Sequence, residues 1–261
     1  MKKIFSILIC IFFFANPSFL YSQIVNIESA RMQSDTVGWM GGAGAAVALT
    51  QNTAKIFATD VEAYLQYKTS NDKGLWLILS NYNFLKVNGK QIISNAFSHL
   101  RYNRKINEWL RWEVFGQYQN NGITQIDSRI LAGTGPRFKL VKNKILRLYA
   151  ASLVMFEREK ERTNPVIKHE DLRSSSYVSL TFTPAENMEL ISTTFFQPLF
   201  KKLSDYRILN QITFRVKATK HFSLSLKWHY LHDRFPAGTA PRTTYTFATG
   251  IDYDLKINPR K

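Results

Sequence analysis

Only a few residues in this sequence have the types and spacing that catalysis needs. His221 and Ser223 stand two positions apart, and a histidine can take the proton of a nearby serine hydroxyl that attacks an ester or amide. Such a pair also needs a third group that orients the histidine, and no asparagine follows at a suitable spacing. We therefore predict no catalytic residue.

Acidic residues offer a second arrangement that could do chemistry. Glu157, Glu159 and Glu161 lie at alternate positions, and His232 directly precedes Asp233. An acidic protease site needs paired carboxylates together with a His–Asp dyad. Proximity in the sequence does not supply that geometry, so we expect both groups to be charged residues of the extracellular rim.

The best candidate for a metal site is the run His169-Glu170-Asp171, which contains a single histidine. Protein zinc sites usually combine three or four His, Cys or carboxylate ligands, so we expect this run to be a solvated loop. The only cysteine is Cys10, near the start of the chain. We therefore predict no metal, no cofactor and no cysteine nucleophile.

The first 22 residues have the pattern of an export signal. Two lysines precede an apolar run of about a dozen residues, and a break at Pro17 and a small residue, Ser22, follow it. A membrane-spanning helix needs roughly 20 apolar residues, so this run is too short to be one. We expect residues 1–22 to be a signal peptide and residues 23–38 to be a periplasmic N-terminal segment.

The chain is strongly basic, with 35 Lys and Arg against 19 Asp and Glu and a formal net charge of +16. Such a balance attracts nucleic acid, anionic membrane surfaces or acidic ligands. Export argues against nucleic acid and leaves lipopolysaccharide and anionic solutes. Aromatic residues make up 14% of this hydrophilic chain, which a membrane β-barrel explains because only alternate residues of its strands face lipid.

Apolar and polar residues alternate strictly over long stretches, most clearly between positions 221 and 232. The even positions there are apolar or aromatic and the odd positions are polar: Phe222, Leu224, Leu226, Trp228 and Tyr230 against His221, Ser223, Ser225, Lys227 and His229. A period of two indicates a β-strand with one apolar face. The same pattern predicts twelve strands, at residues 39–50, 54–69, 74–86, 91–104, 108–119, 124–139, 145–157, 172–183, 188–198, 206–217, 221–232 and 243–255.

The connections between these strands sort by parity. The three longest, residues 158–171, 199–205 and 233–242, each follow an odd-numbered strand, and those after even-numbered strands are short. Outer-membrane barrels have long extracellular loops and short periplasmic turns, and an even strand number closes without an exposed edge. We therefore predict an all-β fold, a closed antiparallel transmembrane β-barrel of about twelve strands over residues 39–255, with its termini in the periplasm and a basic tail at 256–261.

With the apolar faces turned to lipid, the opposite faces place charged residues inside the barrel, where a hydrated lumen tolerates them. The ten that we expect to line the lumen are Glu62, Arg101, Arg111, Glu113, Arg129, Arg147, Arg207, Arg215, Lys227 and Asp252. The same face also holds Asp60, Lys68, His99, Asp127, Lys217, His229 and Asp254. Both signs occur, so we expect pairs across strands and a basic excess. Two interpretations fit this pattern: a narrow passage that favours anions, and a plug of paired charges that does not conduct.

Glycines are concentrated in the first predicted strand, at Gly38, Gly41, Gly42 and Gly44. They do not precede a helix, so phosphate capture at a helix N-terminus is not available. We expect these glycines to let the first strand curve or close against the last.

Three short motifs carry a resemblance. The segment Gln23-Ile24-Val25-Asn26-Ile27-Glu28-Ser29 precedes a glycine-rich first strand with Gly38-Trp39-Met40-Gly41-Gly42, and the last strand contains Gly250-Ile251-Asp252-Tyr253-Asp254. Over residues 30–255 the chain resembles Bacteroidetes-type members of the salt-induced outer-membrane protein family (YdiY-like, domain of unknown function 481). The resemblance implies an outer-membrane barrel without assigned chemistry, so it adds no site residue. Many outer-membrane proteins end on an aromatic residue used in assembly, whereas this chain continues past Leu255.

The expected function is therefore an outer-membrane β-barrel that is either a narrow pore for small solutes, with anions as candidates, or a structural component of the envelope. The alternatives are an outer-membrane enzyme acting on lipid or peptide and a soluble secreted β-barrel or sandwich that binds a ligand. The expected partners are outer-membrane lipid, lipopolysaccharide and the barrel-assembly machinery, and nucleic acid is not among them. A monomer is the default oligomeric state.

Overall fold

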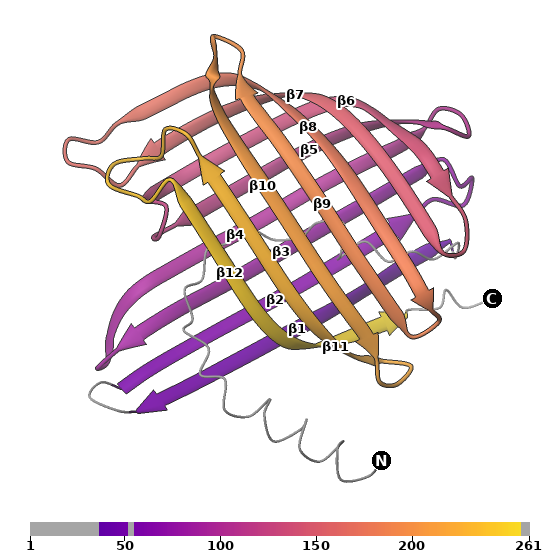
Figure 1. Cartoon of the computed structure of the whole chain (residues 1–261), viewed down its shortest axis with the longest axis horizontal. Coiled ribbons are helices and arrows are strands. Elements are labelled where there is room, and N and C mark those ends of the chain that lie inside the picture. Colours follow the sequence, from indigo (N-terminus) through magenta and orange to yellow (C-terminus); the bar gives the residue numbers. More distant parts are fainter. Residues whose placement is uncertain (1–36, 52–54, 257–261) are drawn as a thin grey trace.

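The computed structural model describes residues 37–51 and 55–256, and all regular secondary structure in them is β-strand. Each strand runs antiparallel to its neighbours in the chain, and the last pairs with the first (Figure 1). The strands are β1 (Gly38–Gln51), β2 (Lys55–Lys68), β3 (Gly74–Val87), β4 (Lys90–Lys105), β5 (Leu110–Asn121), β6 (Ile126–Lys142), β7 (Leu146–Glu161), β8 (Lys168–Ala185), β9 (Met188–Leu199), β10 (Lys202–Lys217), β11 (Phe222–Asp233) and β12 (Thr243–Lys256). The predicted closed antiparallel barrel of twelve strands is confirmed.

Some predicted segments lie outside the described residues. These are the signal peptide at 1–22, nearly all of the periplasmic segment at 23–38, and the tail beyond 256. The described ends of the barrel meet, because Met40 pairs with Lys256. Among the described residues, no helix is long and apolar enough to cross a membrane.

Burial alternates along the strands as the sequence pattern predicts. In β7, Leu153, Met155 and Glu157 are buried, whereas Val154 and Phe156 between them are exposed. Successive side chains of a strand point to opposite faces, so one set fills the interior and the other covers the outside.

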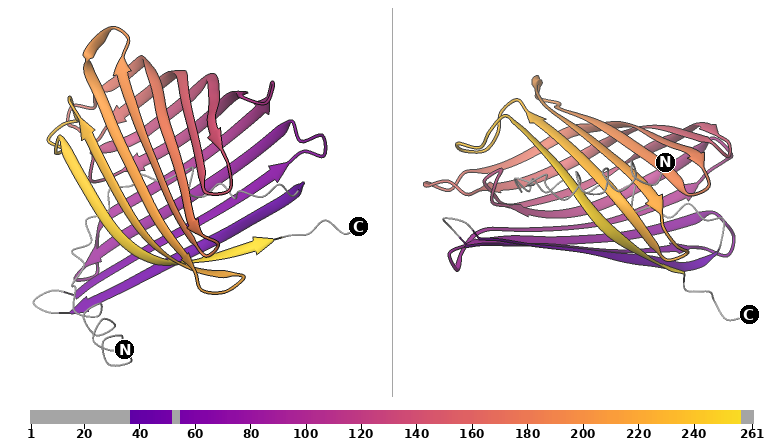
Figure 2. Two further views of the ribbon diagram at one scale, coloured as in Figure 1. Left: turned by 45° about the vertical axis from the view of Figure 1, so that its right-hand side comes forward. Right: turned by 60° about the horizontal axis from the view of Figure 1, so that its bottom comes forward.

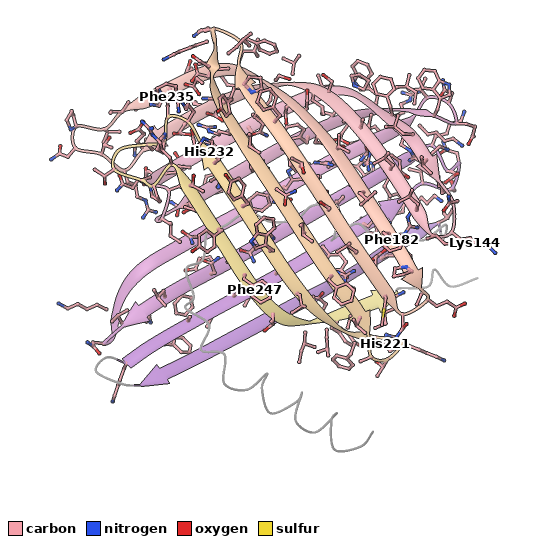
Figure 3. The ribbon with its side chains drawn as sticks, in the orientation of Figure 1. Lys144, Phe182, His221, His232, Phe235 and Phe247 are labelled. Atoms are coloured by element: carbon pink, nitrogen blue, oxygen red, sulfur yellow. The ribbon has the colours of Figure 1, made fainter. Side chains whose placement is uncertain are left out.

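The outer surface is apolar over most of its strands. Phe182 and Phe247, labelled in Figure 3, are both exposed, and Phe247 is 61% exposed. Stacked or tilted aromatic pairs form a girdle at the end of the barrel where the connections after even-numbered strands lie: Trp39 with Tyr67, Trp76 with Tyr102, and Trp109 with Phe138. Soluble proteins rarely expose such a continuous apolar surface, whereas membrane barrels require one.

Short polar side chains make the tight turns at this end. The Asn107 side-chain oxygen accepts hydrogen bonds from the backbone N–H groups of Trp109 and Leu110, and Asn143 does the same for the turn between β6 and β7. Asparagine favours such turns because its side chain mimics a backbone acceptor two or three residues away.

The prediction of long loops at residues 158–171 and 199–205 is wrong. Strand β7 continues to Glu161 and β8 already starts at Lys168, and only two residues connect β9 to β10, the hairpin that protrudes at the top of Figure 1. Cross-strand pairs extend the strands here, for example the 3.1 Å ion pair between Arg158 Nε and Glu170. Charged residues had suggested loops, but opposite charges on facing strands stabilise a protruding hairpin equally well. Residues 234–242 remain the longest connection between described strands.

The seam between β1 and β12 is the shortest stretch of strand pairing among the described residues of the barrel. Within the described residues it runs only from Met40–Lys256 to Ala45–Ile251, whereas β1 pairs with β2 over its whole length. Beyond this register the two strands diverge in Figures 1 and 2. Three of the four glycines of β1 lie in the paired stretch, including Gly44, which faces Glu62 on one side and Asp252 on the other.

Candidate functional site in the lumen

The interior of the barrel contains three groups of charged side chains. Nine of the ten residues expected to line the lumen belong to them, and all nine are buried or half-buried. The tenth, Arg111, is half-buried on β5 and stands opposite Arg137 of β6. Of the other residues predicted on this face, Asp127 instead pairs with the half-exposed Lys160 outside the lumen at 2.7 Å, because the register shifts between Ile126 and Ser128. The side chain of Asp254 lies outside the described part of the chain.

The first group, here called the Glu157 network, surrounds a carboxylate that is 1% exposed. Glu157 accepts a 2.6 Å hydrogen bond from Arg207 Nη1 and lies within 3.9 Å of Arg129 and 3.5 Å of Arg173. Burying an ion is costly unless opposite charges and hydrogen bonds surround it. Three guanidinium groups from β6, β8 and β10 meet that requirement.

Further carboxylates complete this network. Arg207 donates to Asp233 at 2.7 Å, Arg173 to Asp205 at 2.9 Å, and Arg129 to Glu159 at 2.5 Å. The network therefore joins three guanidinium groups to four carboxylates. Its charge is mutually compensated rather than basic.

The second group, the Glu113 cluster, lies on β4, β5, β6 and β8. Glu113 is fully buried, accepts a 2.8 Å hydrogen bond from the Tyr177 hydroxyl, and lies 3.3 Å from Arg101 and 3.8 Å from Arg137. The Arg137 guanidinium also lies 4.2 Å from the centre of the Tyr149 ring, a cation–π geometry. Two guanidinium groups against one carboxylate leave this cluster basic.

The third group, the Glu62 network, crosses the seam of the barrel. Lys227 of β11 pairs with Glu62 of β2 and lies 3.5 Å from Asp252 of β12. From Asp252 the chain of charges continues through Arg215 at 3.4 Å to Glu189 at 3.8 Å. Arg147 extends it to β7, 3.3 Å from Glu189.

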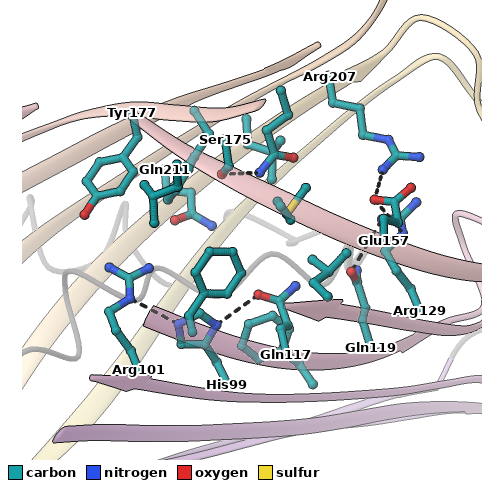
Figure 4. Close-up of a pocket in the computed structure, with 18 of the residues that line it drawn as sticks. His99, Arg101, Gln117, Gln119, Arg129, Glu157, Ser175, Tyr177, Arg207 and Gln211 are labelled. Carbon is teal, nitrogen blue, oxygen red and sulfur yellow. Dashed lines mark hydrogen bonds and ion pairs between the residues drawn. The ribbon is translucent and has the colours of Figure 1, made fainter. Parts of the chain in front are cut away.

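A cavity, here called the chamber, separates the Glu157 network from the Glu113 cluster (Figure 4). It leaves about 80 Å³ for the centres of water molecules. At about 10–15 Å³ for each, this is room for about five to eight waters. Its wall combines amide, charged, aromatic and aliphatic side chains and includes Phe97, His99, Gln117, Phe115, Leu153, Met155, Phe195, Gln197 and Gln211. The lumen is therefore constricted at this level.

The connection between β11 and β12, here called the cap loop (residues 234–242), lines a small cavity that shares Gln119, Arg129 and Leu231 with the chamber. Its Ala237 and Ala240 are buried. The Thr239 N–H donates to Gln125 Oε1 at 3.0 Å, and Gln125 Nε2 donates back to Thr239 Oγ1 at 2.7 Å. The Gly238 N–H donates to Glu161 at 3.1 Å. The loop is thus held down by residues that are distant from it in the sequence.

Glycine is needed at position 238 of this loop. Its φ is +50°, and an added Cβ would lie 2.2 Å from Gln125 Oε1. A residue with a side chain would be strained there and would break the contact between the cap loop and Gln125.

The expected rim position of the acidic residues is wrong for three of them. Glu157, Glu159 and Asp233 lie inside the barrel and are buried. Glu161 is buried as well, at the end of β7, because that strand keeps alternating as far as this residue. Sequence reasoning also missed Arg137 and Arg173 as lumen residues. Extending the two-residue period from Arg129 along β6, and back from Tyr177 along β8, would have found both.

The structure does not assemble the catalytic candidates. Ser223 is buried inside, whereas His221 is exposed at the turn before β11, with its ring 5.8 Å from that of Tyr253. Among the residues that the structure describes, no group of three or more His, Cys, Asp or Glu side chains is placed to hold a metal ion. His169 instead contacts Glu161 at 2.7 Å, and Glu170 contacts Arg158.

Comparison with known proteins gives a family and a fold. The family model described as "Protein of unknown function, DUF481" matches residues 43–255. Among solved structures, the NanC porin is similar with a TM-score of 0.52 at 8% identity, covering 83% of this chain and 100% of that one. The translocator domain of the autotransporter NalP from Neisseria meningitidis has a TM-score of 0.50 at 8% identity, covering 87% and 92%. No curated protein matches the chain. At these identities the two structures show the fold alone.

Proposed function

The chain belongs to the DUF481 family of proteins of unknown function, and we propose that it is an integral outer-membrane barrel that passes small solutes through a narrow, charge-lined lumen. One observation supports the membrane location above all others, the inversion of polarity between the two faces of the strands. Arg137 is 0% exposed inside, whereas Leu224 is 56% exposed outside. Water would penalise this surface and a bilayer would stabilise it.

The proposed pore is small and weakly selective. The chamber holds only a few waters, so a solute has to pass in single file. The sequence predicted a basic excess that favours anions, but the Glu157 network pairs its guanidinium groups with carboxylates. The excess guanidinium of the Glu113 cluster is that of Arg137, which does not line the chamber, so we expect the anion preference in conductance to be modest.

Two experiments, heat modifiability first and bilayer conductance second, test this proposal. The detergent-extracted protein should migrate differently on a gel before and after boiling, because a closed barrel resists unfolding. Reconstituted protein should then show small, discrete conductance steps. Recovery of the protein without detergent would contradict the membrane location, and the absence of channel events at every salt concentration would contradict the pore.

The cap loop allows a sharper test of the pore. In the double variant Gln125→Cys/Thr239→Cys, two side chains that are hydrogen-bonded to each other become a cysteine pair. We expect the oxidised variant to conduct less than the same protein after reduction, since the loop can no longer lift. The single variants are the controls, and the only native cysteine is Cys10.

A structural envelope component without conduction is the second candidate. The mutual pairing of lumen charges favours it, because a fully paired lumen can act as a plug. No catalytic role is part of either proposal. The proposed partners are outer-membrane lipid, lipopolysaccharide and, during insertion, the barrel-assembly machinery.

A further inference from the structure

We infer that the chamber is a binding site for a small uncharged solute rich in hydroxyl groups, about the size of a hexose. The inference rests on the proposed function only in that the solute reaches the chamber through the lumen. Three properties of the chamber wall carry it: its amides, its aromatic rings and the pairing of its charges.

Amide side chains dominate the neutral polar part of the wall. Gln117 and Gln119 come from β5, Gln197 from β9 and Gln211 from β10. Each amide offers both a donor and an acceptor, and a solute hydroxyl can use either. Gln197 already donates to a hydroxyl, that of Ser175 at 3.1 Å, which is the contact that a solute hydroxyl would imitate.

Aromatic rings supply the apolar part of the wall. Phe115, Tyr177 and Phe195 line the chamber, and the rings of Tyr177 and Phe195 are 5.0 Å apart between centroids. The face of a sugar ring carries C–H groups and packs against such rings, while its hydroxyl groups point sideways to the amides. Pockets that combine apolar walls with a few fixed polar groups are typical ligand sites.

The charged groups of the wall disfavour a charged ligand. Arg207 is paired with Glu157 (Figure 4), and Arg101 is paired with Glu113. An ionic solute would lose its hydration and would have to displace one of these pairs, which leaves a buried charge uncompensated. A neutral solute loses less hydration and leaves the pairs intact.

The volume sets the size of the ligand. The chamber holds on the order of five to eight waters, each of which takes up about 30 Å³ in the liquid. A molecule of about 150–240 Å³ would replace them, and a hexose falls in that range.

Calorimetric titration of the purified full-length protein in detergent tests the site. The probes are glucose, glucuronate and glucosamine, which share one ring but are neutral, anionic and cationic. We expect glucose to bind at least tenfold more tightly than either charged analogue. No measurable glucose binding, or tighter binding of a charged analogue, would overturn the inference.

Matched variants then place the site. Gln197→Leu and Gln117→Leu remove an amide from the chamber wall, and each should weaken glucose binding about tenfold. Gln66→Leu makes the same change at a buried lumen residue of β2 that does not line the chamber, and it should bind like the parent. Equal loss in all three variants would refute the chamber as the site, provided that each still gives the heat-modifiable band.

The two proposals fail separately. A protein that binds glucose but never conducts would refute the pore and leave the site. A protein that conducts but binds none of the three probes would refute the site alone.

Discussion

The Glu157 network and the Glu62 network both bury paired charges in the barrel, but the strands around them differ in how far they are hydrogen-bonded to each other. Behind the Glu157 network, β6, β7, β8 and their neighbours pair along nearly their whole length. Behind the Glu62 network, the register of β1 with β12 ends at Ala45 and Ile251. Side chains therefore fill the lumen in the first region, whereas in the second they also connect strands across a short seam.

Gly44 shows how the seam accommodates its charges. An added Cβ would lie 3.1 Å from Glu62 Cγ and 3.3 Å from Asp252 Oδ1. The missing side chain lets residues of β2 and β12 approach each other over β1, where Lys227 reaches both. The expectation that glycines help the first strand to close against the last thus has a structural reason at this position.

The largest expected effect is at Glu157. The change Glu157→Gln removes the one carboxylate that all three buried guanidinium groups of the network share, and removing one partner of a buried ion network costs about 3–5 kcal/mol. We expect the folded gel band to be lost at a clearly lower temperature and at lower urea concentration. The control Glu170→Gln removes a carboxylate from the exposed pair with Arg158, and exposed pairs contribute about 1 kcal/mol or less. Equal stability of both variants would show that the Glu157 network is not desolvated.

The next effect is steric and lies at the seam. Gly44→Val forces a branched side chain against Glu62 and Asp252, and overpacking of this kind costs about 1–3 kcal/mol. The variant should unfold at lower temperature, and hydrogen exchange should rise first in β1 and β12. Gly116→Val is the matched control, because an added Cβ there meets nothing within 4 Å. If exchange rose evenly around the barrel, the seam would not be its weak point.

A smaller effect measures the ion pair across the seam. In a double-mutant cycle, Glu62→Gln and Lys227→Met should show a coupling energy of about 1 kcal/mol, because the effects of mutating two residues in contact on the free energy of unfolding are not additive. Gly44→Val pushes Glu62 aside, so it should reduce that coupling. A coupling energy of zero would mean that Lys227 fills space without holding the seam together.

The smallest effect is expected outside the barrel wall, in the turn between β4 and β5. Glu108 lies 2.5 Å from Lys105, whose hydrogen bond lowers the pKa of the Glu108 carboxyl below its ordinary value. A lowered pKa adds stability that is present above the ordinary pKa of about 4.5 and is lost as the pH falls through the lowered value. Lys105→Met should therefore leave the free energy of unfolding at pH 7 almost unchanged. Below pH 4.5 that free energy should depend less on pH in the variant than in the parent protein. A large loss at pH 7 would contradict the view that exposed pairs matter little here.

The sequence alone determined the strand number and the inward faces. Side-chain direction in a strand depends only on a local period of two, so Arg101, Glu113 and Arg207 could be assigned to the interior without knowing their neighbours. Local pattern failed where strands continue beyond the apolar stretch, as in β7 up to Glu161, because charged strand ends look like loops.

Only the tertiary structure decided which charges meet. Lys227 and Glu62 are 165 residues apart in the sequence, and Gln125 and Thr239 are 114 apart. Their contact depends on closure of the barrel, on the register at the seam and on the fold of the cap loop. The sequence therefore placed charges in a lumen, whereas closure determined their pairing and enclosed a chamber between them, because both depend on distances across the barrel that no local pattern records.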